Sequence, residues 1–506
     1  MRFTRSLVAL YAAVGLSTVA CETDLTALNV NPNSPTTAPA TTLFTNATVN
    51  AVTRWAGATQ LSGTELFAQH LAQVQYVEED RGRLRTETID GWFSAGYTSE
   101  LEDFEKVIAI ADAAVPPSPN TSGPANVMQS WVFLNMTDLW GDIPYSEALQ
   151  GDVGGPLKPK YDAQKDIYYG LLATLTSASG AMVVGSLDPA LGSADPVYQG
   201  DISKWLKLSN SLRARMAMRL QKQAAEAGKM ATELTAAFSA PGGVMTSNAD
   251  NAKLTWPGDG VFNNPWSVNF STRDDHRVSK TLLDTMSKLN DPRVPIYAQP
   301  TVADPTKYTG LQNGLNNVTV TPFFNTSSRI GAIFYPGATV YGTFGTSAGQ
   351  KTPSYIMTYA ELCFIQAEAK ERGLGGAGLP GTAASYYDAG VTASITQWGG
   401  TAAQAATYLA QPGVAYVAGA TGLAQIGLQK WISLFSQGTE AWSNWRRTGY
   451  PATIVVGPSY YPEHGGVFPR RIPYPSNEQS VNKAALDAAI AIQGADTYST
   501  KMWWDK

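Results

Sequence analysis

The sequence predicts a mainly α-helical protein with long irregular loops and a few short strands. Apolar residues recur at three- and four-residue spacing through most of the chain, which is the period of an amphipathic helix. Between about residues 240 and 352, however, Gly, Asn, Thr, Pro and aromatic residues crowd together without that period. Because this stretch is too long for one connecting loop, we expect irregular coil with short strands there.

Residues 1–20 have the order of charge, apolar core and small residues that is typical of an export signal. Arg2 and Arg5 precede an apolar run of roughly ten residues, whereas a bilayer span needs about 20. Cys21 follows at the expected cleavage point, although Thr18 stands where bacterial lipoproteins usually have Leu. We therefore predict a lipoprotein signal peptide over 1–20 and a lipid anchor on Cys21. The alternative is a soluble secreted protein with a chance cysteine.

Residues 21–40 are rich in Asn and Pro, lack periodicity and predict an extended leader. The remainder, 41–506, is predicted to be a single α-helical domain, and paired helices throughout it would permit a degenerate helical repeat. We expect its helices near residues 41–56, 61–77, 97–114, 123–139, 164–180, 201–226, 276–289, 354–372, 382–398, 421–436 and 478–491.

The composition excludes a nucleic-acid partner. Only 15% of the 506 residues are charged, against a typical value of about 25%, and the net charge is −5. Removal of residues 1–20 leaves 34 basic and 41 acidic residues, a net charge of −7. No basic stripe is present that would neutralise phosphates. The 13 Trp, 23 Tyr and 16 Phe residues supply rings for the core and for stacking on ligands.

Two glycine motifs match enzyme signatures without their usual context. Gly345–Gly349 fits G-x-S-x-G, but Pro353 follows closely where a nucleophile elbow needs a helix. Gly376–Gly381 fits G-x-G-x-x-G, but it follows a helix rather than a strand. We interpret both as loops. A secreted or anchored hydrolase that uses Ser347 remains an alternative function.

The charged pairs on the later helices favour structural roles. Glu361 and Glu368 lie seven residues apart on one helix face, where they would bond to basic side chains or helix ends, or alternatively act as an acid–base pair of a hydrolase. Arg446 and Arg447 precede Gly449 and favour helix capping, with ligand binding by Arg447 as the alternative. Cys363 is expected in the core. The three His and two Cys residues are too dispersed for a metal site, and no cofactor is expected.

Several strings follow one another in an order that resembles one known family: "LNVNPNSPT", "LNMTDLWGDIPYSEAL", "KWLKLSNSLRARMAMR", "MTYAELCFIQAEAKERG", "EAWSNWRRTGYP", "PRRIPYP" and "KMWWD". Together with "PKYDAQKDIYYGLL", "DHRVSKTLLD", "NDPR", "YYDAGVTAS" and "LQKWISLF", they resemble the SusD/RagB family of nutrient-binding outer-membrane lipoproteins. The resemblance extends from residue 28 to residue 505.

The resemblance implies a scaffold of tetratricopeptide-like helix pairs with a ligand face built from loops. It implies a non-enzymatic lipoprotein on the cell exterior, held in the outer membrane by lipid. Its partners would be a SusC-like TonB-dependent transporter and an oligosaccharide or peptide nutrient that the protein delivers to that transporter. A helical-repeat adaptor that binds only protein is a further alternative.

No ligand-contact motif of the family can be matched residue by residue, so the predicted binding residues come from the aromatic and hydrogen-bonding side chains of non-helical stretches. They are Tyr76, Arg81, Trp92, Asn264, Trp266, Arg273 and Tyr335.

Overall fold

The computed structural model describes residues 38–188, 190–335 and 349–506, and residues 40–506 form one compact unit. Cys21 and Ser347 lie outside the described residues. The longer helices are α3 (Ala40–Thr53), α5 (Thr86–Gly96), α6 (Glu102–Ala113), α7 (Pro119–Trp140), α8 (Gln164–Ala181), α9 (Ile202–Arg219), α10 (Ala227–Phe238), α12 (Lys280–Lys288), α15 (Tyr359–Glu371), α16 (Ala383–Gln397), α17 (Ala402–Leu409), α18 (Ala420–Ser433), α19 (Gly438–Thr448) and α21 (Lys483–Gln493).

In the part of the chain that the structure describes, six short strands form three antiparallel pairs. β1 (Leu71–Gln73) pairs with β5 (His276–Val278), β2 (Ile143–Pro144) with β3 (Tyr161–Asp162), and β4 (Ala252–Leu254) with β6 (Ser354–Met357). The short helices are α4 (Glu65–Phe67), α11 (Pro265–Phe270), α13 (Val294–Tyr297), α14 (Asn317–Val320) and α20 (Glu478–Val481).

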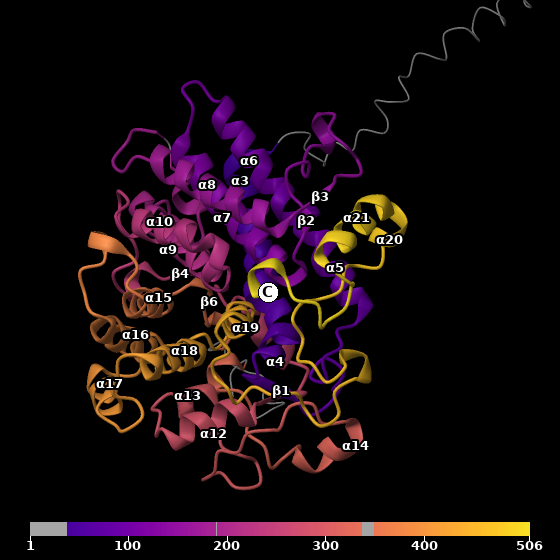
Figure 1. The fold of residues 1–506 in the computed structure, drawn as a ribbon, viewed down its shortest axis with the longest axis vertical. Helices are drawn as coiled ribbons and strands as arrows, with labels where there is room; N and C mark the ends of the chain where they lie inside the picture. Colours follow the sequence, from indigo (N-terminus) through magenta and orange to yellow (C-terminus); the bar gives the residue numbers. More distant parts are fainter. Residues whose placement is uncertain (1–37, 189, 336–348) are drawn as a thin grey trace, which may run out of the picture. The chain divides into compact units, whose positions relative to one another are not determined.

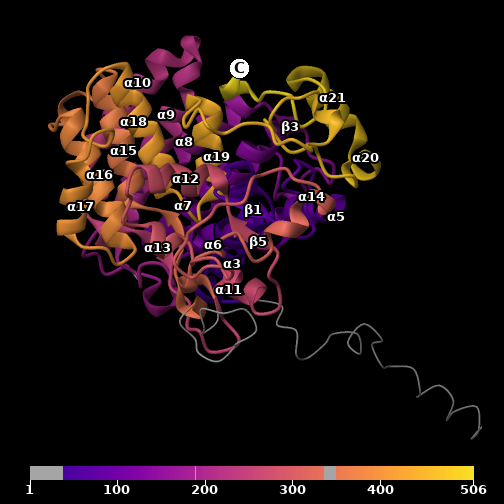
Figure 2. The ribbon, with the colours of Figure 1, turned by 90° about the horizontal axis from the view of Figure 1, so that it is seen from below.

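Successive helices pack side by side, α6 on α7, α7 on α8, α8 on α9 and α9 on α10, and a second group joins α15 to α16 and α18. These helices occupy one side of the compact unit, while α5, α14, α20 and α21 lie on the other (Figures 1 and 2). The predicted mainly α fold with tetratricopeptide-like helix pairs is confirmed. Within the part of the chain that the structure describes, no helix combines the length and apolar character needed to cross a bilayer.

Three of the predicted helices begin or end differently because the tertiary structure uses their ends as strands, and one of them is the helix expected over 354–372, whose first four residues form β6. The helix expected over 61–77 stops at Phe67, and residues 71–73 pair as β1 instead. Residues 276–278 likewise form β5 before α12 begins at Lys280. The apolar residues in both stretches are buried, and a short buried strand has no period that separates it from a helix.

Candidate ligand-binding site

The pairing of β1 with β5 brings two distant loops together (Figure 2). Gln73 lies opposite His276, so the antiparallel register places residue 76 opposite residue 273. The backbone N–H of Val74 continues the pairing and donates to the carbonyl of Asp275 at 2.8 Å. The loop after β1 and the loop before β5 therefore form one local surface.

Tyr76 and Arg273 meet on this surface. The Arg273 guanidinium lies 5.2 Å from the centre of the Tyr76 ring, and the ring is 55% exposed. Tyr76 has a φ of +54°, a left-handed conformation that is uncommon for a residue with a side chain and is often found at binding sites. Both side chains line a hollow of about 520 Å³ whose other lining residues are Gln75, Thr272, Asp274, Asp275 and Phe324.

A second aromatic ring is held at the hollow by a buried arginine. The Nη2 of Arg277 donates to the carbonyl of Phe324 at 2.6 Å, and the guanidinium lies 4.8 Å from the centre of the Phe324 ring. Asp274 accepts from Arg277 at 3.0 Å and from Arg329 at 2.8 Å. These bonds fix the Phe324 loop against β5.

The carboxylate of Asp275 orients Arg273. One Asp275 oxygen accepts from Nε of Arg273 at 3.0 Å, and the other lies 2.9 Å from Nδ1 of His276. Burial opposes the charge, but His276 and Arg273 together hold the pKa of Asp275 well below its ordinary value. The carboxylate is thus ionised, and it keeps the guanidinium beside the Tyr76 ring.

This arrangement suits a ligand that has both flat apolar faces and polar groups. Aromatic rings pack against apolar faces, while a half-exposed guanidinium donates hydrogen bonds in fixed directions. The size of the hollow lies within the range of small-molecule sites. Among the described residues, no group of His, Cys, Asp and Glu is arranged to hold a metal ion.

The structure brings two of the predicted binding residues, Tyr76 and Arg273, to this hollow. Arg81 lies elsewhere, because its Nε donates to the carbonyl of Ser459 at 2.6 Å and its guanidinium packs 4.1 Å from the Tyr461 ring centre. Arg81 therefore joins the loop after β1 to the C-terminal segment.

The other four predicted binding residues are buried, which corrects their proposed role. Trp266 is 2% exposed and packs on Phe334, and Trp92 is 5% exposed in the same core. Asn264 caps α11 by accepting from the N–H of Trp266 at 2.9 Å. Tyr335 stacks on Phe270 at 4.8 Å, and burial raises its pKa. A ligand ring cannot reach these side chains while the core stays packed.

Sequence reasoning missed Phe324 and Asp275. Phe324 lies in the aromatic-rich coil between residues 240 and 352, but many other aromatic rings of this coil pack in the hydrophobic core, so the sequence does not single out Phe324. The string Arg273-Asp274-Asp275 does carry a signal, because adjacent opposite charges in a coil predict local ion pairs. The string does not show which residues of other segments these side chains contact.

The glutamates that offered a hydrolase site are bound to buried arginines. Glu361 accepts from Arg215 at 2.8 and 2.5 Å, and Glu368 accepts from Arg447 at 2.7 and 2.6 Å. Arg447 thus pairs with α15 rather than capping its own helix. Gly449, with a φ of +75°, ends α19 as expected.

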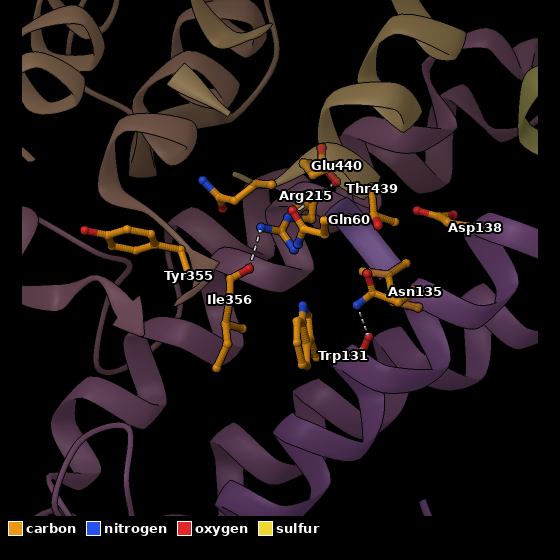
Figure 3. Close-up of a pocket in the computed structure, with 11 residues that line it drawn as sticks. Gln60, Trp131, Asn135, Asp138, Arg215, Tyr355, Ile356, Thr439 and Glu440 are labelled. Atoms are coloured by element: carbon orange, nitrogen blue, oxygen red, sulfur yellow. Dashed lines mark hydrogen bonds and ion pairs between the residues drawn. The ribbon is translucent and has the colours of Figure 1, made fainter. Parts of the chain in front are cut away.

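A small polar cavity lies beside this ionic network (Figure 3). Trp131 and Asn135 of α7, Arg215 of α9 and Glu440 of α19 face it. Its volume of about 20 Å³ has room for roughly one water molecule and not for a sugar. The cavity is therefore a packing feature of the helix interface.

The remaining predictions for this region are confirmed. Cys363 is fully buried, and burial raises the pKa of its thiol to about 12. Gly376–Gly378 form a turn of 3₁₀ helix after α15, with Gly375 at a φ of +91°, so this glycine motif is a loop. It follows a helix and opens no nucleotide site.

Residues 32–475 match the SusD-like family described as starch-binding and associating with the outer membrane. The chain is a SusD-like protein. Proteins of the SusD family bind without catalysis, which answers the hydrolase alternative. A comparison with curated proteins finds no match.

Solved structures share the SusD-like fold over nearly the whole chain. A chitin-binding protein is 28% identical, with a TM-score of 0.79, and the match covers 92% of this chain and 100% of that one. A SusD homolog from Bacteroides uniformis is 23% identical, with a TM-score of 0.77 and coverage of 92% and 99%. A chitin-binding SusD homolog from Flavobacterium johnsoniae is 24% identical, with a TM-score of 0.75 and coverage of 92% and 98%.

Proposed function

We propose that this SusD-like protein is a surface lipoprotein that binds an oligosaccharide at the Tyr76–Arg273–Phe324 hollow and delivers it to a TonB-dependent transporter of the SusC type. The observation that carries the binding proposal is the exposed Tyr76 ring beside the oriented Arg273 guanidinium. Pyranose rings offer apolar C–H faces to the aromatic residues and hydroxyl groups to the guanidinium and Gln75.

Chitin oligosaccharides are the first ligands to test. The 28% identical relative is a chitin-binding protein, and the N-acetyl carbonyl of each sugar is an acceptor that matches the Arg273 donors. A peptide is the other nutrient class that the resemblance implies. An array that contains both glycans and peptides separates the two classes.

Calorimetry with chitohexaose tests the hollow. Tyr76→Ala should raise Kd about tenfold, equivalent to about 1.4 kcal/mol, because it removes the stacking ring. Phe262→Ala is the matched control, since Phe262 is a comparably exposed ring (50%) that lines a different groove. Unchanged affinity in Tyr76→Ala, or a loss confined to Phe262→Ala, would remove this hollow from the proposal.

The lipid anchor is tested separately through Cys21. Wild-type protein should fractionate with outer membranes and carry acyl groups on Cys21 by mass spectrometry, whereas Cys21→Ser should be released from the membrane. An unmodified Cys21 in membrane-bound protein would contradict the anchor and leave the ligand site standing.

A further inference from the structure

The charged side chains that line the hollow differ in how far they are exposed. The side chain of Arg273 is 44% exposed, whereas those of Asp274 and Asp275 are 3% and 6% exposed. A ligand that enters the hollow therefore meets a guanidinium group, while the two carboxylates are almost wholly covered by protein.

The carboxylate of Asp274 is shared by two arginines. One of its oxygens accepts from Nη1 of Arg277 at 3.0 Å and from Nε of Arg329 at 2.8 Å, and the other accepts from Nη2 of Arg329. These three residues, which we call the Asp274 cluster, have two positive charges and one negative charge. Arg273 and Asp275 neutralise each other, so the charge beside the hollow is positive overall. Because the Asp274 cluster is buried, solvent screens its charge only weakly.

Arg273 has hydrogen-bonding capacity left for a ligand. Its Nε donates to Asp275 at 3.0 Å, but no hydrogen bond joins its Nη1 or Nη2 to any residue that the structure describes. The acetamido group of an N-acetylated sugar has a carbonyl oxygen that accepts from such donors. A deacetylated sugar carries an ammonium group at the same position, and an ammonium group can only donate.

We infer that Arg273 makes the hollow select N-acetylated sugars over deacetylated, cationic ones, an inference that rests on the proposed function. The guanidinium donates to the acetamido oxygen, whereas the same guanidinium and the Asp274 cluster repel a protonated amine. Repulsion of the wrong ligand adds to the specificity that the hydrogen bond provides. The protein thereby distinguishes chitin oligosaccharides from the chitosan oligosaccharides that deacetylation produces.

The experiment is calorimetry with chitohexaose and with the hexamer of glucosamine, at low salt and at a pH that keeps the glucosamine amines protonated. Wild type should bind chitohexaose at least about tenfold more tightly. Arg273→Lys retains the positive charge and should retain most of this preference. Arg273→Gln removes the charge and leaves the Asp275 carboxylate open to an ammonium group, so the preference should fall below about threefold.

Arg83→Gln is the matched control. The side chain of Arg83 is 47% exposed and also pairs with a carboxylate, that of Glu463, but it does not line the hollow. Its loss should leave the preference for chitohexaose unchanged. Because the side chains of Arg83 and Arg273 are both half-exposed, the variants should melt close to the wild-type temperature. Added salt should reduce the preference of the wild type, since it screens the repulsion of the ammonium group.

The outcomes that contradict the inference differ from those that contradict the proposed function. Equal affinity of the wild type for the two hexamers, or tighter binding of the glucosamine hexamer, would overturn the inference and leave the oligosaccharide proposal standing. A full preference for chitohexaose in Arg273→Gln would overturn the role of Arg273. Absence of binding of either hexamer to the wild type would overturn binding of chitin at the hollow, and the inference with it.

Discussion

Glu368 is a buried carboxylate that lies between two guanidinium groups. It bonds to Arg447 at 2.7 and 2.6 Å and to Arg372 at 2.9 Å. Although burial opposes ionisation, the charge and hydrogen bonds of Arg447 and Arg372 lower the pKa of Glu368 to about 2. Buried pairs of this kind are costly to break, because the partner is left charged and unpaired.

Glu368→Gln should therefore lower the free energy of unfolding by about 3–5 kcal/mol at pH 7, as measured by urea denaturation. Glu87→Gln, on the exposed surface of α5, is the control and should change the stability by less than about 0.5 kcal/mol. A Glu368→Gln protein as stable as the control would show that the pair contributes little.

The same pair predicts a pH dependence. The pKa of Glu368 is near 4.5 when unfolded and about 2 when folded, so its stabilisation is complete above about pH 4.5 and is lost as the pH falls toward 2. The stability difference between wild type and Glu368→Gln should shrink over this window. A difference that stays constant from pH 6 to pH 3 would contradict the lowered pKa.

At the scale of elements, the ends of helices decide how distant segments meet. α7 ends at Trp140, and the next residue, Gly141, has a φ of +86° and an N–H that donates to the carbonyl of Thr137 at 2.8 Å. The side chain of Gln493, from the end of α21, packs directly on this glycine and accepts from the N–H of Asp142 at 2.8 Å. A Cβ at Gly141 would lie 1.7 Å from Oε1 of Gln493, so any larger residue at this position displaces the Gln493 side chain that joins α7 to α21.

Gly141→Ala should lower the free energy of unfolding by about 1–3 kcal/mol more than Gly419→Ala does. Gly419 is the matched control, because its φ of +86° and ψ of −149° resemble those of Gly141 (+86° and −117°), but a Cβ there meets no atom within 4 Å. Both variants carry the cost of an alanine in a conformation that only glycine adopts readily, so the difference in chemical denaturation isolates the contact with Gln493. Equal losses of stability in the two variants would show that the Gln493 side chain moves away from the added methyl group at little cost.

At the scale of the whole molecule, the last residues of the chain complete the core between α7 and α9. Trp504 is fully buried, and its indole N–H donates to Asp138 of α7 at 3.0 Å. Asp505 bonds to Lys222 at 2.8 Å and to Arg470. The C-terminal segment thus contacts helices that precede it by more than 280 residues.

A chain that ends at Lys501 should unfold at a markedly lower temperature, with a loss of at least about 3–5 kcal/mol from the buried tryptophan alone. A chain that ends at Asp505 is the control and should lose less than about 1 kcal/mol, since only the exposed Lys506 is removed. Differential scanning calorimetry of both would check this, and near-equal melting temperatures would contradict a structural role for Trp504.

The sequence alone predicts the helices whose apolar stripes are long, such as α8 and α9, because periodicity reports directly which face is buried. The sequence predicts secondary structure less well where a segment is short and buried on all sides. β1 and β5 are examples, since their residues have no exposed face to set a period.

The same limit applies to the candidate site. Tyr76 and Trp266 are both aromatic residues in loops, and local sequence does not separate an exposed ring from a buried one. The antiparallel register of β1 with β5 places Tyr76 opposite Arg273, and the packing of Phe334 against Trp266 closes the core over the tryptophan.

By itself, the sequence determined the helical class of this protein and its membership of the SusD-like family, because those depend on patterns repeated along the chain. Only the tertiary structure decided which aromatic rings face solvent and which glutamates are bound to arginines. These features depend on contacts between residues up to several hundred positions apart, and no local pattern encodes such a contact.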